Sequence, residues 1–259
     1  MNYGLYLSAA GALSSMHRQD VLANNLANMN TVGFKPDRVD TRQRLPERLE
    51  SPDTFASPQL LLERLGGGLL VQPTRIELKQ GNLITTDNDL DLALEGPGLF
   101  VVGSGYGGDD RDVRFTRDGR FTLNARGELV MAANGMNVLD AGRRPIHLDP
   151  ASPVRIDPAG TILQNGAAVA QLGVVDAPDP ADLVKQGDNL MRLADNAATP
   201  PRTASGRVRQ GYTESSAVDP VMMMNAMMTA AKAAQGNFRM IQQHDHIIGQ
   251  TMNTFARVA

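Results

Sequence analysis

Cysteine and tryptophan are absent from this 259-residue chain, and aromatic residues make up only 4% of it. Without cysteine the chain can form no disulfide, no thiolate metal site and no thiol nucleophile. Sugar-binding sites usually stack rings on their ligand, so the shortage of aromatics speaks against a glycan-binding protein. A basic surplus is missing as well. The net charge is −3, whereas a nucleic-acid-binding protein usually carries a concentrated basic face, so we expect no nucleic-acid partner.

Long apolar runs are also missing. No stretch approaches the roughly 18 apolar residues of a membrane-spanning helix, so we expect no membrane insertion. The opening residues, MNYGLYLSAAGALSSM, are weakly apolar and are broken by Gly4 and Ser8. The first basic residue is Arg18, so the positively charged start of a secretory signal peptide is lacking. We expect AGA at residues 10 to 12, a passable cleavage site, to remain uncut.

What the chain does contain, near its N-terminus, is a heptad-like spacing. Seven positions alternate four and three residues apart between residues 5 and 26, and six of them are apolar, which predicts a helix over residues 3 to 26. Its only charges are Arg18 and Asp20, so we expect a helix surrounded by neighbours. The seam positions are Leu5, Ala9, Ala12, Met16, Gln19, Ala23 and Leu26.

The C-terminal region repeats this spacing, with eight of eleven seam positions apolar. No proline follows Pro220, which leaves room for a second long helix. Because most helical stability comes from tertiary packing, we predict that the two helices pair in a coiled coil whose burial other copies complete. The seam positions are Met223, Met227, Ala230, Ala234, Asn237, Ile241, His244, Ile248, Thr251, Phe255 and Val258.

The middle of the chain has the pattern of β structure. The leucines of DLDLAL, residues 89 to 94, alternate with polar or small residues, which indicates a half-buried strand. RFTRDGRFTL, residues 114 to 123, predicts a hairpin that turns at Asp118-Gly119. Further turn signals are Asn134-Gly135, Asn165-Gly166 and DPAG at residues 157 to 160.

The sequence therefore predicts an α+β fold in four segments. Residues 1–36 and 206–259 form the two halves of a coiled-coil helical domain. Residues 74–205 form an all-β outer domain, either a sandwich or a partly closed barrel. Residues 37–73, rich in charge and proline, form an irregular connector that we expect to order only against partners.

Signals of chemistry are weak. GSGYGG, residues 103 to 108, matches a dinucleotide-binding pattern, but that site needs a helix to begin there. The acidic DDRDVRF follows instead, so we interpret the glycines as a loop between strands. His244 and His246 would lie about 200° apart on a helix, which makes a shared metal difficult.

Pairs of acidic residues are similarly uninformative. Asp109-Asp110 and the pair Asp87 and Asp89 lie in loops rich in Gly and Asn, where solvated carboxylates are ordinary. No Ser-His-Asp order or nucleophile elbow is visible. We therefore expect a protein that is not an enzyme and needs no metal or cofactor.

Two unusual runs remain. VMMMNAMM, residues 221 to 228, suits either an adaptable binding groove or core filling, and we favour seam packing between copies. ANNLANMNTVGFK, residues 23 to 35, holds four asparagines. Asn24 and Asn28 share a helix face, so a buried amide there would fix the register of the helix pair. The simpler alternative is an Asn-capped helix end followed by a turn through Thr31 and Gly33.

The same run carries a resemblance. LANNLANMNTVGFK resembles the N-terminal signature of the axial family, the bacterial flagellar rod and hook proteins. The matching residues are Ala23, Asn24, Asn25, Leu26, Ala27, Asn28, Thr31, Gly33, Phe34 and Lys35.

Three further blocks, at residues 90–102, 115–130 and 211–224, resemble later blocks of that family in the same order. The fourth block departs from the usual pattern at Ala217, where asparagine is common, and in the methionines that follow. The matching residues are Leu90, Asp91, Leu92, Ala93, Gly96, Gly98 and Phe100; Thr116, Arg117, Gly119, Phe121, Gly127 and Leu129; and Gly211, Glu214, Ser216 and Val218.

The resemblance implies a structural subunit of the flagellar basal-body rod, of the proximal or distal type, with the proximal type slightly favoured. Such subunits stack helically into a shaft that carries motor torque to the hook. The implied partners are copies of the chain, other rod and hook-side axial proteins, the flagellar type III export apparatus, and the surrounding ring or peptidoglycan. The implied location is the periplasmic rod, reached without a cleaved signal peptide.

We expect the assembly interface to lie on both helices and on the signature. An alternative function is a secreted, oligomeric β-domain module that binds peptidoglycan or another envelope glycan. The expected N-terminal interface residues are Leu5, Ala9, Ala12, Met16, Ala23, Asn24, Asn25, Leu26, Asn28, Thr31, Gly33 and Phe34. The expected C-terminal ones are Met223, Met227, Ala230, Ala234, Ile241, Ile248 and Phe255.

Overall fold

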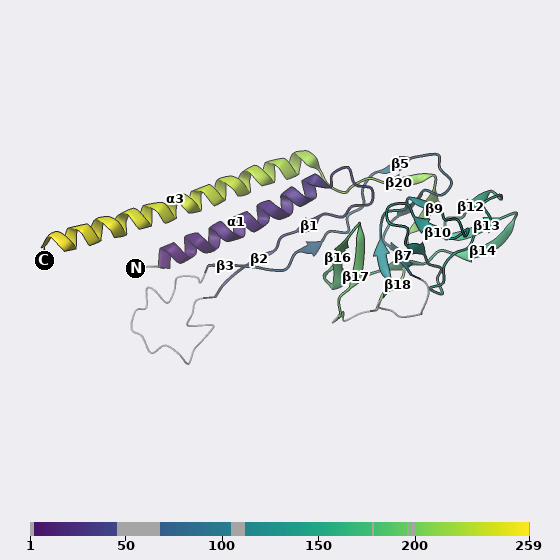
Figure 1. Ribbon diagram of the computed structural model, residues 1–259, viewed down its shortest axis with the longest axis horizontal. Coiled ribbons are helices and arrows are strands. Elements are labelled where there is room, and N and C mark those ends of the chain that lie inside the picture. The colour runs from purple at the N-terminus through teal and green to yellow at the C-terminus, as the bar shows by residue number, and fades with distance from the viewer. Residues whose placement is uncertain are drawn as a thin grey trace. The chain divides into compact units, whose positions relative to one another are not determined.

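The computed structural model describes residues 3–45, 68–104, 112–177, 179–195, 197 and 200–258. The chain divides into two compact units. The helical unit comprises residues 1–26, 37–75 and 219–259, and the β unit comprises residues 27–36 and 76–218. The protein is α+β, as predicted: along the chain, helix α1 comes first, the β strands follow, and helix α3 comes last (Figure 1).

Both terminal helices are present. Helix α1 spans Tyr3–Ala27, and helix α3 spans Pro220–Val258, a length of 39 residues. The start of α3 is set locally by Asp219, whose Oδ1 accepts hydrogen bonds from the backbone N–H groups of Val221 at 3.0 Å and Met222 at 3.1 Å. Pro220 follows this N-cap at the first helical position, where its missing N–H costs nothing.

The two helices lie side by side and run in opposite directions (Figure 1). Gly4 of α1 faces His244 of α3, and Gly11 faces Asn237. The contacts thus move seven residues forward on α1 and seven back on α3. A Cβ atom on Gly11 would lie 2.8 Å from Nδ2 of Asn237, so the absence of a side chain allows this close approach.

The described parts of the connector form two short antiparallel ribbons. Strand β1 (Asp37–Arg38) pairs with β4 (Arg75–Ile76), and β2 (Thr41–Gln43) pairs with β3 (Leu69–Val71). The predicted connector also includes residues 46 to 67, which lie outside the described residues.

The largest element of the β unit is a nine-stranded antiparallel sheet. Its main path runs β16-β17-β8-β7-β11-β10-β9, and β15 joins β7 on one side and β18 on the other. Since β16 and β9 end this path, the described strands do not close into a barrel. The strands are β7 (Leu99–Gly103), β8 (Arg114–Thr116), β9 (Phe121–Leu123), β10 (Leu129–Met131), β11 (Asn137–Val138), β15 (Val174–Asp176), β16 (Leu183–Gly187), β17 (Leu190–Leu193) and β18 (Arg202–Thr203).

Smaller sheets complete the unit. Strands β12, β13 and β14 form a three-stranded sheet, β19 pairs with β6, and β20 pairs with β5. A short 3-10 helix, η2 (Pro180–Asp182), precedes β16. The strand bounds are β5 (Leu83–Thr85), β6 (Leu92–Glu95), β12 (Val154–Ile156), β13 (Thr161–Gln164), β14 (Ala167–Gln171), β19 (Arg207–Gln210) and β20 (Tyr212–Glu214).

The core lies on both faces of β7. Phe100 and Val102 belong to one buried cluster, and Leu99 and Val101 belong to another. Alternate side chains of a strand point to opposite faces, so β7 is covered on both sides.

The predicted half-buried strand forms β6, but it is not half-buried. Ala93 is buried as completely as its neighbours Leu92 and Leu94. Alternate side chains point to opposite faces, so both faces of β6 are covered.

The predicted hairpin at Asp118-Gly119 is wrong. Strand β8 pairs with β7 and β17, whereas β9 pairs with β10. The segment between them packs along β6 instead, where the carbonyl of Gly119 accepts a hydrogen bond from the N–H of Leu92 at 2.9 Å. A Cβ atom on Gly119 would collide with the carbonyl oxygen of Leu92, so this glycine serves close packing rather than a free turn.

The other turn predictions hold. Asn165 and Gly166 have φ values of 52° and 79° and connect the paired strands β13 and β14. Gly135 lies in the connection between β10 and β11, and the N–H of Gly160 closes the DPAG turn on the carbonyl of Asp157. Within the described part of the chain, no helix combines the length and apolar character needed to cross a membrane.

Candidate functional site

The signature loop, residues 28–36, leaves α1 and packs within the β unit. Gly33 is the point of closest approach. Its φ is +69° and its N–H donates to the carbonyl of Glu214 at 2.7 Å. A Cβ atom there would lie 2.5 Å from the backbone carbon of Arg117. Only glycine combines this backbone conformation with this contact.

Side chains from β16 and from the turn between β16 and β17 hold the same loop. The Lys185 ammonium lies 4.3 Å from the ring centroid of the buried Phe34 and donates to the carbonyl of Lys35 at 2.6 Å. Nδ2 of Asn189 donates to the carbonyl of Val32 at 2.8 Å. The loop is therefore held by Lys185 and Asn189 in addition to the Gly33–Glu214 hydrogen bond.

Lys35, near the end of the loop, belongs to a buried ionic cluster with Arg117 and Glu214. We call these three residues the buried triad. Oε1 of Glu214 accepts from Nζ of Lys35 at 2.6 Å and from the N–H of Gly81 at 2.7 Å. Oε2 accepts from Nε of Arg117 at 2.5 Å. The three side chains are between 0% and 4% exposed, so this is a fully buried ionic cluster.

Arg117 also ties the triad to the turn between β6 and β7. Its Nη2 donates to the carbonyls of Leu94 at 2.8 Å and Gly96 at 2.7 Å, and its Nη1 donates to the carbonyl of Gly98. Buried charges are tolerable only when paired and hydrogen-bonded. Here one guanidinium satisfies a carboxylate and three carbonyls together.

Burial lowers the pKa of Lys35 below its ordinary value of 10.5, and the Glu214 carboxylate opposes that shift. The folded state therefore binds fewer protons than the unfolded state between these two pKa values. Between these two values the lysine's contribution makes stability rise with pH.

The triad lies where the segment that follows α1 meets the segment that precedes α3. Gly33 bonds to Glu214 as described, and the N–H of Ala217 donates to the carbonyl of Phe34 at 3.2 Å. The segment leaving α1 is thus bonded directly to the segment leading into α3.

The four asparagines have different surroundings. Asn25 is 1% exposed, and its amide forms two hydrogen bonds to the backbone of Asp37, donating to the carbonyl at 2.8 Å and accepting from the N–H at 2.9 Å. Asn28 accepts at its Oδ1 from the Thr31 hydroxyl at 3.1 Å, in a turn that follows the helix. Asn24 and Asn30 are exposed. The alternative of a helix end followed by a turn describes Asn28, while Asn25 fastens β1 to α1.

Replacing Asn25 with alanine should speed hydrogen exchange of the Asp37 amide about tenfold or more, because that amide loses its buried acceptor and a hydrogen bond contributes about 1–1.5 kcal/mol. Exchange measured by NMR or mass spectrometry tests this. The exposed Asn30 provides the control, since Asn30→Ala should change the rate by less than about twofold. Equal effects of the two substitutions would contradict the assignment.

Replacing Gly33 with alanine should lower the free energy of unfolding by about 2–4 kcal/mol, because left-handed strain and overlap with Arg117 add together. Gly135 has a similar φ of +72° but open space around it. Gly135→Ala should therefore cost only the strain, about 1–2 kcal/mol. Urea unfolding of both variants separates the two effects, and equal losses would mean that the loop does not pack as described.

The predicted interface residues differ in burial within a single chain. Ala12, Ala230 and Ala234 are buried, whereas Met16, Ala23 and Ile248 are exposed. Gly33 and Phe34 are buried in the β unit. The side chain of Phe255 lies outside the described residues. The half-buried members are Leu5, Ala9, Leu26, Asn28, Thr31, Met223, Met227 and Ile241.

Both helices expose large apolar side chains. On α1, Tyr6 is 69% exposed and Leu13 is 66% exposed. The exposed apolar residues of α3 include Val221, Met222, Met224, Met228, Phe238, Met240, Ile247 and Met252. The methionine run therefore contributes exposed surface as well as the half-buried Met223 and Met227.

The weaker sequence signals fall outside this arrangement. Residues 105 to 108 of the glycine-rich run and Asp109-Asp110 lie outside the described residues. His244 packs against Gly4, and His246 hydrogen-bonds to Gln250. Among the described residues no group of three or more His, Asp or Glu side chains is placed to hold a metal ion.

Sequence reasoning missed the triad as a site. Lys35, Arg117 and Glu214 each match a block of the axial family, but no spacing rule pairs residues so far apart. Charge alone gave no signal either, because the block around Arg117 also holds Asp118, Arg120, Arg126 and Glu128.

Three protein-family models match the chain in order. They are described as "Flagella basal body rod protein" over residues 7–35, "Flagellar hook protein FlgE/F/G D1 domain" over residues 93–174, and "Flagellar basal body rod FlgEFG protein C-terminal" over residues 209–254. Lys35 ends the first match, and Glu214 lies within the third. The two outer matches cover much of the helical unit, and the middle one covers much of the large sheet.

Curated relatives match along nearly the whole chain. A flagellar basal-body rod protein FlgF of Caulobacter vibrioides is 33% identical over 242 residues, which cover 93% of each chain. A FlgF of Mesorhizobium japonicum is 30% identical, covering 94% of this chain and 93% of that protein. A flagellar basal-body rod protein FlgG of Agrobacterium fabrum is 31% identical, covering 94% and 95%.

Proposed function

This chain belongs to the family of flagellar basal-body rod proteins, and from that premise we propose that it is a structural subunit of the rod. Copies assemble helically into the axial drive shaft, which transmits motor torque to the hook. The observation that carries this proposal is the pair of antiparallel terminal helices (Figure 1), which expose many large apolar side chains in a single chain.

Exposed apolar surface of this extent supports assembly. Soluble monomers rarely expose large contiguous apolar patches, and burying a Leu, Met or Val side chain contributes about 1.5–3 kcal/mol. Tyr6 and Leu13 on α1 and the exposed methionines on α3 therefore gain much of their burial from neighbouring copies. The faces of α1 and α3 that meet at Gly4 and Gly11 form the coiled coil within one chain, and the exposed set forms the contacts between copies.

In the assembly, each subunit makes the same contacts with its neighbours along a helical path. The exposed apolar residues of one subunit lie on both α1 and α3, which suits a head-to-tail contact between unlike surfaces. Such a contact, when its rotation does not close, produces an open filament. The other rod and hook-side axial proteins meet the ends of this filament through the same helical surfaces.

The buried triad fixes the positions of two distant chain segments within the β unit. Within the β unit it joins the segment that follows α1 to the segment that precedes α3. A charged, fully hydrogen-bonded cluster has few alternative geometries, which suits a rigid shaft.

The remaining expectations follow from the rod role. The subunit has no catalytic activity, it reaches the periplasmic rod through the flagellar type III apparatus without signal cleavage, and it adopts its paired helices on assembly. The ring and peptidoglycan surround the completed shaft. The alternative of an envelope-glycan-binding module has no support from the relatives.

Deletion of the gene tests the proposal. Cells without the gene should lack the hook and everything that assembles after it. Electron microscopy of isolated basal bodies should show assembly stopped before the hook. Complementation with a labelled chain should restore swimming, and the position of the label assigns the subunit to the proximal or distal segment. Normal swimming of the deletion strain would contradict the proposal.

A further inference from the structure

Methionine is concentrated on α3, which carries seven of the chain's thirteen methionines. Five of the seven are exposed, and Met222 and Met252 are the most exposed, at 67% and 68%. Because the chain has no cysteine, methionine thioethers are its only sulfur groups. We call the five the exposed α3 methionines, and they are Met222, Met224, Met228, Met240 and Met252.

Met252 is exposed because α3 continues past the start of α1 (Figure 1). Gly4, in the first turn of α1, already faces His244. Met252 follows the half-buried Ile241 by eleven residues, about three helical turns, and so lies on the same face of α3. The seam face of α3 is therefore exposed at Met252 in a single chain.

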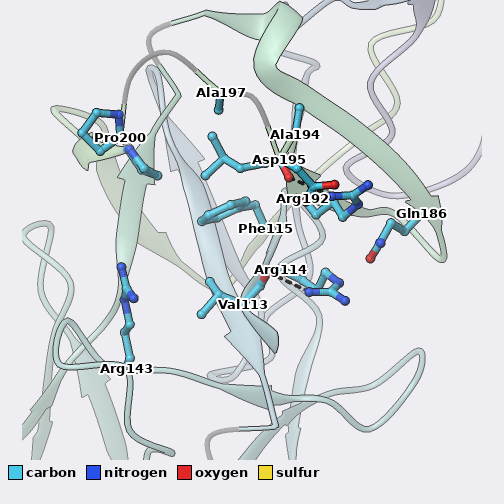
Figure 2. A pocket seen from close by; sticks show the side chains of 12 residues that line it. Val113, Arg114, Phe115, Arg143, Gln186, Arg192, Ala194, Asp195, Ala197 and Pro200 are labelled. Atoms are coloured by element: carbon cyan, nitrogen blue, oxygen red, sulfur yellow. Dashed lines mark hydrogen bonds and ion pairs between the residues drawn. The ribbon is translucent and has the colours of Figure 1, made fainter. Parts of the chain in front are cut away.

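The methionines of the large sheet have the opposite surroundings. Met131 on β10 is 1% exposed and Met191 on β17 is 2% exposed. The residue after Met191, Arg192, lines an open hollow of about 790 Å³ and is paired there with Asp195 at 3.0 Å (Figure 2). Alternate side chains of a strand point to opposite faces, and Met191 belongs to a buried cluster. Solvent that fills the hollow therefore does not reach the Met191 sulfur.

An exposed thioether is open to oxidation by a hydroperoxide. The sulfur lone pair attacks one peroxide oxygen, a sulfur–oxygen bond forms, and the oxygen–oxygen bond breaks. With hydrogen peroxide the second oxygen leaves as water, so the sulfur loses two electrons and the peroxide gains them. The product, methionine sulfoxide, is polar and disrupts interfaces that are rich in methionine.

Oxidation changes the surface that α3 presents to a neighbouring copy. An exposed methionine is an apolar side chain that burial against another subunit stabilises. A sulfoxide oxygen buried in the same contact costs free energy unless it finds a hydrogen-bond donor. Met224 and Met228 are four residues apart and share one face of α3, so two sulfoxides would fall within a single contact.

We propose that the exposed α3 methionines are sulfoxidation sites, at which a hydroperoxide turns a free subunit into one that cannot join the shaft. This inference rests on the proposed rod function, because the contacts it affects are those between copies. Once a subunit is assembled, its neighbours cover the same side chains and exclude the oxidant. Oxidised chains are thus kept out of the shaft, while assembled chains are protected.

The first test compares oxidation rates. Hydrogen peroxide is added to the purified full chain and to isolated basal bodies, and mass spectrometry of the digested protein follows the added oxygen at each methionine. In the free chain, Met222 and Met252 should oxidise about tenfold or more faster than the buried Met131 and Met191. In basal bodies, the exposed α3 methionines should oxidise about tenfold or more slowly than they do in the free chain.

The second test replaces all five exposed α3 methionines with leucine, which keeps the apolar character and the helix propensity. When dilute peroxide is present during rod assembly, the number of basal bodies per cell should fall about tenfold with the unmodified chain and less than about twofold with the leucine variant. The matched control is Met136→Leu, at a half-buried methionine between β10 and β11, which should stay as sensitive as the unmodified chain.

A third variant imitates the sulfoxides without any oxidant. Met224→Gln combined with Met228→Gln places two polar amides on one face of α3, and glutamine forms helices about as well as methionine does. This double variant should reduce the number of basal bodies per cell about tenfold, because the amides are buried in the contact between copies. Met136→Gln should change the number by less than about twofold.

The proposal is overturned if the leucine variant is as sensitive to peroxide as the unmodified chain, or if the glutamine double variant assembles normally. It is also overturned if the exposed α3 methionines oxidise as fast in basal bodies as in the free chain. Absence of the chain from isolated basal bodies would instead contradict the rod function itself, so the two failures are distinguishable. If the leucine variant does not assemble even without peroxide, the oxidation rates and the glutamine variant still decide.

Discussion

Glu214→Gln should lower the free energy of unfolding by about 3–5 kcal/mol, the largest loss we expect from any single substitution in the β unit. The change is nearly isosteric, but it removes the only carboxylate shared by Lys35 and Arg117 within the buried triad. Two buried cations are then left without a counter-charge, and breaking a buried ion pair from one side typically costs this much. Urea unfolding followed by circular dichroism measures the loss.

The control is the same substitution on the surface. Glu95 also pairs with an arginine, Arg209, at 2.8 Å, but the two side chains are 47% and 53% exposed. Exposed pairs contribute about 0–1 kcal/mol, so Glu95→Gln should be nearly neutral. If Glu214→Gln were as mild as Glu95→Gln, the triad would not be the structural centre of the signature loop. In cells, we expect Glu214→Gln to abolish swimming and Glu95→Gln to preserve it.

Gly11→Leu should prevent rod assembly almost completely. Gly11 of α1 faces Asn237 of α3 so closely that a Cβ would lie 2.8 Å from its amide nitrogen. Leucine is a better helix former than glycine by close to 1 kcal/mol, so a loss of assembly cannot come from helix propensity. It would come from overpacking, which typically costs about 1–3 kcal/mol per site and recurs in every subunit. The number of complete basal bodies per cell should fall about tenfold or more.

Two variants separate the contact from simple bulk. Gly236 of α3 has no atom within 4 Å of where its Cβ would lie, so Gly236→Leu has room within the chain and should assemble. Asn237→Ala, combined with Gly11→Leu, removes the opposing amide and should restore part of the assembly. Equal failure of Gly11→Leu and Gly236→Leu, with no rescue by Asn237→Ala, would trace the effect to surface bulk and contradict the helix contact.

The extents of the two helices could be predicted because their signals are local. A seven-residue spacing predicted a helix over residues 3 to 26, which ends one residue before α1 does, and the absence of proline after Pro220 left room for a second long helix, where α3 lies. The contacting face of α1 was harder to predict. Gly4 and Gly11, which face α3, each precede a predicted seam position by one residue. A seam of small residues lacks the hydrophobic contrast on which periodicity arguments depend.

In the β unit, only the features decided by local sequence could be predicted. Turns whose chemistry is local, such as Asn165-Gly166, were predicted correctly. The segment at Asp118-Gly119 was not, because its conformation is decided by the distant β6. The triad is the extreme case, since Glu214 and Lys35 are 179 residues apart in the chain. The resemblance named Lys35, Arg117 and Glu214 only as members of three separate blocks, and the structure is what brings their side chains together.

The most direct test of the account is whether α1 and α3 of one chain pair inside the assembled rod. Since the chain contains no cysteine, a double variant Gly11→Cys and Asn237→Cys can be oxidised in isolated basal bodies without background. Facing helix positions lie close enough for a disulfide, so we predict efficient cross-linking within one chain, seen as a mobility shift on a non-reducing gel. A control double variant, Gly11→Cys with the exposed Gln235→Cys, should not cross-link. No cross-link between residues 11 and 237, or equal cross-linking in the control, would contradict the pairing of the two helices.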